Sequence, residues 1–315
     1  MGTDAAVSVT GLEKSYKNLK VLDKIDFAVP KGSVFALLGP NGAGKTTTIK
    51  ILTTLLKPDQ GNAQIYGNDV VRQPGRVRAM ISLAGQEAAV DHILTGRENL
   101  QLIGRLRHLP DVNREADALL ERFDLADAAD RRVATYSGGM GRRLDLAMSL
   151  LGNPAVMFLD EPTSGLDPQS RLIAWQIIRD LAGSGIAVFL TTQHLEEADQ
   201  LADHIAILNE GRIVAEGAPA KLKKLLPHGH IELTFNNGPD LETAEKLFGE
   251  YRATTDEQNQ TLTIITDGSI KQMTDILKRL EAADIAVAGF TQKLPTLEDV
   301  FLSYTGNDSA EEDVV

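Results

Sequence analysis

The sequence of 315 residues has no cysteine and a single tryptophan, and none of its apolar runs approaches the roughly 20 residues that a membrane-spanning helix needs. The lack of cysteine excludes disulfides and thiolate–metal sites. The first residues, MGTDAAVSVTG, lack the basic start and the apolar stretch of a signal peptide. We therefore expect a cytoplasmic protein with no direct membrane insertion, so that any role at a membrane depends on a partner.

Positive charge is also in deficit. Lys and Arg number 32 against 44 Asp and Glu, which gives a net charge of −12. An acidic protein repels nucleic acid and anionic lipid, so we expect neither as the main partner. The densest basic segment, residues 221–224, is expected to be a solvated helix face. The apolar fraction of 43% is typical of a globular protein, and the length favours two domains.

The segment around which the chain is organised is GPNGAGKTTTIK, residues 39–50. An apolar run at residues 33–38 predicts a buried strand before it, and helical spacing follows it. Its GxxxxGK[ST] spacing is typical of a phosphate-binding loop, in which glycines allow successive backbone N–H groups to surround an anion. We expect a nucleoside triphosphate to be bound by Gly39, Pro40, Asn41, Gly42, Ala43, Gly44, Lys45, Thr46 and Thr47.

Three residues in or near this loop have separate expected roles. Lys45 is expected to reach the β- and γ-phosphates, and the Thr46 hydroxyl is expected to ligate Mg²⁺. Tyr16 lies in a polar stretch upstream of the loop, where its ring can stack on a base. The alternative for Tyr16 is a half-buried tyrosine in a strand.

Two adjacent carboxylates, Asp160 and Glu161, follow the apolar run at residues 155–159. Carboxylates at the end of a buried strand are costly unless they hold a cation or do chemistry. We expect Asp160 to hold Mg²⁺ through water and Glu161 to polarise the attacking water.

Two further polar residues follow apolar runs that are predicted to be buried strands. Gln86 follows residues 80–84 and is either a ligand of Mg²⁺ or water, or an ordinary loop amide. His194 follows the run at residues 186–190 and is either structural or part of the site. Functional residues of open α/β sheets lie at such strand ends, so for each of the two residues both interpretations stay open at this point.

Ser137, Gly138 and Gly139 precede residues with helical apolar spacing. Ser137 is a predicted N-cap, and the two glycines leave the start of the helix open to a phosphate group. The alternative is a capped helix with no ligand.

The chain is predicted to consist of two domains and a tail, with the boundary at residues 227–229, where Pro, His and Gly interrupt the pattern. Residues 5–226 form the larger domain, with a helical part at about 90–150. Residues 228–306 form a small α/β sandwich, in which strands are expected at 231–235, 261–266 and 285–290, and helices at 241–248, 270–283 and 297–304. Residues 307–315 are an acidic tail that is expected to be frayed.

With these motifs in place, the chain resembles an ATP-binding cassette (ABC) ATPase over residues 7–226. The resemblance rests on five ordered motifs, which are the phosphate loop at 39–47, Gln86, the signature YSGGM at 136–140, the carboxylate strand at 155–161 and the loop SGLD at 164–167. It implies a P-loop NTPase fold with a mixed core sheet, an antiparallel β subdomain and a helical subdomain.

The resemblance also implies a head-to-tail homodimer. In this family each ATP lies between the phosphate loop of one cassette and the signature helix of the other. Ser137, Gly138 and Gly139 would therefore bind nucleotide in trans, and Tyr16 would stack on the adenine. ATP and Mg²⁺ are the implied cofactors.

Two features depart from the usual family pattern. The signature begins with Tyr136 and ends with Met140, where Leu and Gln are usual. The switch histidine is replaced by Gln193, with His194 one position later. Glutamine can hydrogen-bond the γ-phosphate but cannot act as an acid. We expect hydrolysis through Glu161 to be retained but slowed, and His194 is the alternative switch residue.

Both departures resemble the daunorubicin-resistance branch of multidrug-exporter ATPases, as does the segment at 295–306. This resemblance implies an ATPase that powers efflux of a drug-like or other hydrophobic compound. It also implies a separate transmembrane permease that holds the protein on the cytoplasmic face of the cell membrane. The alternatives are a soluble ABC ATPase without a transport role, and a nucleotide-gated regulatory module with weak hydrolysis.

Overall fold

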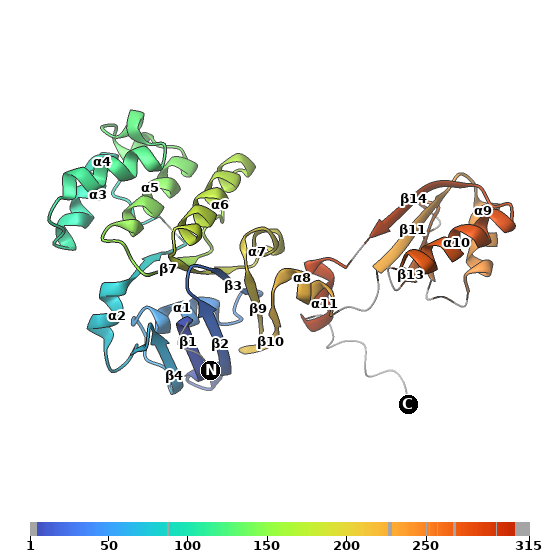
Figure 1. The fold of residues 1–315 in the computed structure, drawn as a ribbon, viewed down its shortest axis with the longest axis horizontal. Helices are drawn as coiled ribbons and strands as arrows, with labels where there is room; N and C mark the ends of the chain where they lie inside the picture. The colour runs from blue at the N-terminus through green and yellow to red at the C-terminus, as the bar shows by residue number, and fades with distance from the viewer. Residues whose placement is uncertain are drawn as a thin grey trace. The chain divides into compact units, whose positions relative to one another are not determined.

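The computed structural model describes residues 5–86, 88–225, 229–249, 251, 253–256, 258–266, 269–293 and 295–305. The chain divides into two compact units after Pro219 (Figure 1). The division lies a few residues before the predicted boundary at 227–229, of which residues 227 and 228 lie outside the described residues, as does the predicted tail at 307–315.

The core of the first unit is a six-stranded mixed sheet. Its strands are arranged in the order β10 (Arg212–Gly217), β9 (His204–Asn209), β3 (Val34–Leu38), β8 (Ala187–Thr192), β7 (Val156–Asp160) and β6 (Ile81–Ala84). All neighbours are parallel except β10 and β9. Every residue of β3, β7 and β8 is buried, as expected of apolar strands covered on both faces. Because these strands are parallel, their carboxyl ends meet at one edge of the sheet.

A second, antiparallel sheet contributes to the same core. Its strands are β2 (Leu19–Pro30), β1 (Ala5–Tyr16), β4 (Gln60–Ile65) and β5 (Asn68–Asp69), in that order. Apolar side chains of this sheet, of α1 (Lys45–Leu52) and of the six-stranded sheet form one buried cluster. Within it, the rings of Phe35 and Phe189 stack at 5.5 Å between centroids, and Phe27 stacks on both. This packing holds α1 and the loop before it against the sheet edge.

Helices complete the first unit: α2 (Pro74–Met80), α3 (Gly96–Leu106), α4 (Val112–Arg122), α5 (Gly138–Leu150), α6 (Pro168–Gly183) and α7 (Leu195–Leu201), with 3-10 turns at Ala126–Ala128 and Val133–Thr135. The predicted helical subdomain is confirmed, and α3, α4 and α5 lie together in it (Figure 1). Ser137 is the N-cap of α5, since its hydroxyl accepts a hydrogen bond from the Met140 N–H at 3.2 Å. The sequence pattern did not predict α2 and α7.

The second unit contains a four-stranded antiparallel sheet in the order β12 (Ala253–Asp256), β13 (Thr261–Thr266), β11 (Gly229–Phe235) and β14 (Val287–Lys293). Helices α9 (Gly238–Leu247) and α10 (Ile270–Ala282) share a buried apolar cluster with it. The order of elements is β-α-β-β-α-β, preceded by α8 (Pro219–Lys223) and followed by α11 (Leu297–Thr305). The predicted α/β sandwich is confirmed, with β12 as an additional strand.

In the part of the chain that the structure describes, no helix combines the length and the apolar character needed to span a membrane.

Candidate functional site

The loop between β3 and α1 requires glycine at two positions for steric reasons. A Cβ on Gly39 would lie 2.3 Å from the Leu208 carbonyl oxygen. A Cβ on Gly44 would lie 2.7 Å from Leu22 Cδ2, and Gly44 also has a φ of 112°, which side chains rarely adopt. The loop is therefore pressed against its neighbours, and the N–H groups at the start of α1 are left open to an anion.

The Lys45 side chain, only 5% exposed, folds back over this loop. Its ammonium donates to the carbonyl oxygens of Gly39 at 2.8 Å and Pro40 at 3.0 Å, and it lies 3.7 Å from Glu161 Oε1. Burial lowers the pKa of Lys45, while the nearby carboxylates of Glu161 and Asp160 oppose this shift. The ammonium is thus held by two carbonyl oxygens, which phosphate oxygens can replace, and by the more distant Glu161 carboxylate.

Asp160 ends β7 and is held by hydroxyl groups from two other elements. Its Oδ1 accepts hydrogen bonds from Thr191 Oγ1 of β8 at 2.5 Å and from Thr46 Oγ1 of α1 at 3.4 Å. Asp160 is buried. The Thr46–Asp160 pair supplies oxygen donors of the kind that Mg²⁺ prefers.

Glu161 has a backbone φ of 48°, in the left-handed region. Such a conformation costs a non-glycine residue about 1–3 kcal/mol and is typical of active sites. It is stabilised by the Glu161 N–H, which donates to the Thr191 carbonyl oxygen at 3.1 Å. The Glu161 carboxylate lies 3.7 Å from the Lys45 ammonium.

A cavity of about 340 Å³ brings half of the predicted site residues together. The cavity is lined by residues of the phosphate loop and α1 and by four residues from other segments. They are Asn41, Gly42, Gly44, Lys45, Thr46 and Thr47, together with Tyr16, Val21, Gln86 and Glu161. Tyr16 is 45% exposed at the end of β1, and the Lys14 ammonium lies 5.8 Å from the centre of its ring. The cavity therefore joins segments that are up to about 145 residues apart in sequence, from Tyr16 to Glu161. Its volume is suitable for a nucleotide.

The structure does not bring every predicted residue to this cavity. Ser137, Gly138 and Gly139 lie at the start of α5 and are not among its lining residues. Gln193 is exposed directly after β8, and the His194 N–H donates to Thr192 Oγ1 at 2.9 Å. Neither Gln193 nor His194 lines the cavity. Gly39, Pro40, Ala43 and Asp160 do not line it either, although Lys45 donates to Gly39 and Pro40, and Thr46 donates to Asp160.

The sequence reasoning missed Thr191, which is fully buried and holds Asp160 through its hydroxyl. The signal was present, because two polar residues, Thr191 and Thr192, end an otherwise apolar strand. A hydroxyl buried at a strand end needs a hydrogen-bond partner. The neighbouring parallel strand β7 offers its terminal carboxylate at the paired position, Asp160.

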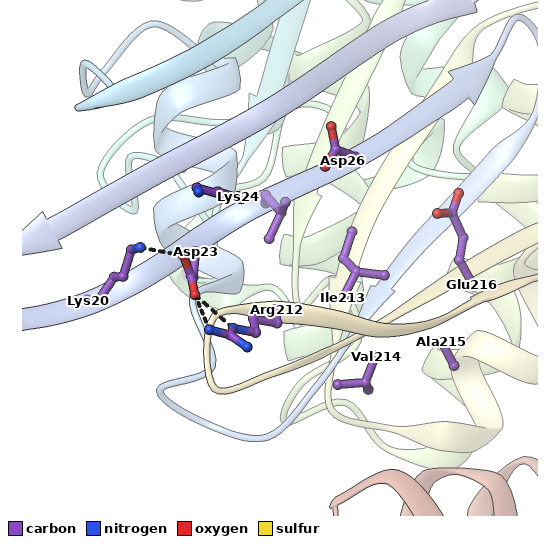
Figure 2. Close-up of a pocket in the computed structure, with 10 residues that line it drawn as sticks. Lys20, Asp23, Lys24, Asp26, Arg212, Ile213, Val214, Ala215 and Glu216 are labelled. Atoms are coloured by element: carbon purple, nitrogen blue, oxygen red, sulfur yellow. Dashed lines mark hydrogen bonds and ion pairs between the residues drawn. The ribbon is translucent and has the colours of Figure 1, made fainter.

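A larger cavity of about 860 Å³ lies between β2 and β10, away from all predicted site residues (Figure 2). Asp23 is bound there by Lys20 and by Arg212, whose Nε donates to Asp23 Oδ2 at 2.7 Å. These hydrogen bonds lower the pKa of Asp23. The charged lining residues are three basic ones, Lys20, Lys24 and Arg212, and three acidic ones, Asp23, Asp26 and Glu216. This cavity therefore has no excess positive charge for a phosphate group.

Comparison with known proteins agrees with this geometry. Residues 22–164 match the ABC transporter family, and residues 217–305 match the C-terminal domain of the DrrA1-3-like ATP-binding proteins. The daunorubicin resistance ATP-binding protein DrrA3 of Streptomyces coeruleorubidus is 46% identical over 97% of this chain and 97% of its own length. The daunorubicin/doxorubicin resistance ATP-binding protein DrrA of Streptomyces peucetius is 42% identical over 96% of this chain and 93% of its own.

A solved structure of an ATP-binding subunit of an ABC transporter has a TM-score of 0.63 and 28% identity, covering 70% of this chain and 92% of that one. The predicted fold class and the resemblance to the daunorubicin-resistance branch are both confirmed. The chain therefore belongs to the ATP-binding subunits of ABC transporters, which are ATPases, and carries a DrrA1-3-like C-terminal domain.

Proposed function

We propose that this ATPase powers export of a drug-like, hydrophobic compound through a separate transmembrane permease, to which it binds on the cytoplasmic face of the membrane. The observation that carries the ATPase part is the single cavity lined by Lys45, Gln86 and Glu161. The export part is supported by the daunorubicin-resistance proteins, which resemble this chain over nearly its whole length.

In this proposal the phosphate loop binds the triphosphate. Backbone N–H groups of Gly42 and of residues 44–47 surround the phosphates, and the Lys45 ammonium exchanges the Gly39 and Pro40 carbonyl oxygens for phosphate oxygens. The adenine stacks on Tyr16 at the open end of the cavity. Binding thus uses the positive end of α1, because the first N–H groups of a helix have no partner within it.

The donor set at the cavity fits Mg²⁺. Thr46, Asp160 and Gln86 offer a hydroxyl, a carboxylate and an amide oxygen, which are ligand types that this ion accepts. The described residues include no cluster of three or more acidic or histidine side chains that could hold a metal, so most ligands here would come from phosphates and water. When bound, Mg²⁺ would neutralise charge on the phosphate oxygens.

Hydrolysis depends on Glu161 in this account. Its carboxylate lies beside Lys45, where it can accept a proton from a water molecule directed at the γ-phosphate. Gln193 and His194 are alternative contacts to the γ-phosphate, and alanine at each position distinguishes them by its effect on turnover.

The signature residues are proposed to act in a second copy of the chain. Ser137 and Gly138 are exposed at the N-terminus of α5, where unpaired N–H groups favour an anion. They do not line the cavity of their own chain. Both observations fit a head-to-tail homodimer. In such a dimer the N-terminus of α5 of one copy covers the ATP that is bound by the other copy.

Recovery of the tagged chain from membranes tests the export function. We expect a multi-spanning permease to copurify with the wild-type chain and with Glu161→Gln, because the substitution leaves the surface unchanged. Cells with Glu161→Gln are expected to retain more of the fluorescent compound daunorubicin than wild-type cells, since the transporter cannot reset. Recovery with ribosomes or DNA instead of a permease would contradict the proposal, as would equal retention of the compound.

A further inference from the structure

A buried arginine outside the nucleotide cavity connects two of the segments that form it. Arg142 lies on α5 and is 5% exposed. Its Nε donates to the Pro162 carbonyl oxygen at 2.7 Å, and its Nη1 donates to the Gly85 carbonyl oxygen at 2.7 Å. Pro162 directly follows Glu161, and Gly85 directly precedes Gln86. One guanidinium group thus contacts the neighbours of both residues.

The partner of this arginine strengthens the connection. Arg142 Nη1 lies 3.0 Å from Asp145 Oδ2, one turn further along α5. The other oxygen, Asp145 Oδ1, accepts a hydrogen bond from the Ala89 N–H at 3.0 Å. Gly85 and Ala89 lie on either side of Gln86, so the ion pair fixes the chain both before and after this residue.

Burial disfavours both charges of this pair. It lowers the pKa of Arg142 and raises the pKa of Asp145, and the attraction between the two groups opposes both shifts. A buried ion pair generally adds little stability compared with apolar side chains of similar size. The ion pair also forms hydrogen bonds with three backbone groups, which belong to Gly85, Ala89 and Pro162. These contacts indicate that its role is to hold the two backbone segments in place.

The segment after Glu161 is held from a second side. Thr163 Oγ1 donates to Glu197 Oε1 of α7 at 2.7 Å, and the Trp175 indole N–H donates to the same oxygen at 3.3 Å. Glu197 is 1% exposed. Buried charges from α5 and α7 therefore hold Pro162 and Thr163, the two residues that follow the left-handed backbone of Glu161.

We propose that Arg142 is a positioning residue for hydrolysis, which holds the Gln86 segment and the Glu161 segment at a fixed separation across the cavity. The proposal rests on the proposed role of Glu161 as the base. Arg142 does not line the cavity, so it acts on the reaction through these two segments. A shift of about 1 Å in such groups can reduce the rate of a reaction about 100-fold.

The test compares turnover and ATP affinity in the full-length chain. Arg142→Gln alone leaves Asp145 as an unpaired buried charge, so the double variant R142Q/D145N is made as well. The matched control is Arg143→Gln on the same helix, because Arg143 Nη1 donates to Phe123 and Asp124, which lie away from the Gln86 and Glu161 segments in sequence. Emission of Trp175, the single tryptophan, checks that each variant is folded.

We expect the double variant to lose about 100-fold in kcat, while its Kd for Mg·ATP changes by less than about threefold. Arg143→Gln is expected to keep the wild-type kcat. The proposal is overturned if the double variant keeps the wild-type kcat, if its affinity falls as much as its kcat, or if Arg143→Gln has the same effect.

Glu161→Gln, assayed in parallel, separates this proposal from the function on which it rests. Retained turnover in Glu161→Gln would remove the assigned base and with it the proposed function. Lost turnover in Glu161→Gln together with wild-type turnover in R142Q/D145N would remove only the positioning role of Arg142.

Discussion

Glu161→Gln is expected to reduce ATP turnover about 10²- to 10⁴-fold while Mg·ATP affinity is retained. Glutamine has the size of glutamate and can still hydrogen-bond a water molecule, but it cannot accept its proton. The backbone contact of residue 161 with Thr191 does not involve the side chain and is preserved. Phosphate release measures turnover, and isothermal titration with Mg·ATP measures affinity.

The matched control for this substitution is Glu210→Gln. Glu210 also has a left-handed backbone, with a φ of 46°, but it is exposed in the hairpin between β9 and β10. We expect wild-type turnover from this variant. Comparable turnover in Glu161→Gln and in the wild type would show that Glu161 is not the base. Another group at the cavity would then have to accept the proton.

Lys45→Ala is expected to weaken Mg·ATP binding by about 100-fold or more, because a buried charge that contacts the phosphates is lost. The same substitution leaves the buried Glu161 carboxylate without the ammonium that lies 3.7 Å from it, so we also expect a loss of stability. Isothermal titration with Mg·ATP measures the affinity, and urea unfolding without nucleotide checks that the variant is folded.

Lys50→Ala provides the comparison, since Lys50 is exposed at the other end of the same helix, α1. It removes an equal charge from the same element without touching the loop. We expect wild-type affinity and stability from it. If Lys45→Ala bound Mg·ATP as tightly as Lys50→Ala, the loop at 39–47 would not be the phosphate site.

Much of the site could be predicted because its parts are local in sequence. A buried strand, a glycine-rich loop and a helix follow one another within about 20 residues, from Val34 to Leu52, and their spacing alone specifies the phosphate loop. The carboxylates at 160 and 161 were predicted from the cost of burying them at a strand end. Parallel pairing of β3, β8 and β7 then brings these segments to one edge.

The supporting contacts could not be predicted, because they depend on tertiary packing. Arg142 and Asp145 are three residues apart on a helix, a pattern that usually indicates a solvated ion pair. Both are buried because they form hydrogen bonds with backbone groups of Gly85, Ala89 and Pro162. Nothing in the sequence near residue 142 points to segments nearly 60 residues before it.

Short elements were missed for a similar reason. Strand β12 has the sequence ATTD, with no large apolar residue, and it forms through backbone pairing with β13. Helices α2 and α7 have seven residues each, which is too short for a clear helical period. Their positions are decided by the sheets on which they pack.

The central claim is that a second copy of the chain covers the ATP bound at the phosphate loop. Sedimentation of Glu161→Gln with and without Mg·ATP tests it most directly, with Ser137→Asp in the same background as control. Aspartate keeps the N-cap of α5 but repels a phosphate group. We predict that Mg·ATP raises the mass of Glu161→Gln from 34.1 kDa to twice that value, and that Ser137→Asp prevents this while ATP still binds. A mass of one chain at saturating Mg·ATP, or a dimer unaffected by Ser137→Asp, would contradict the account.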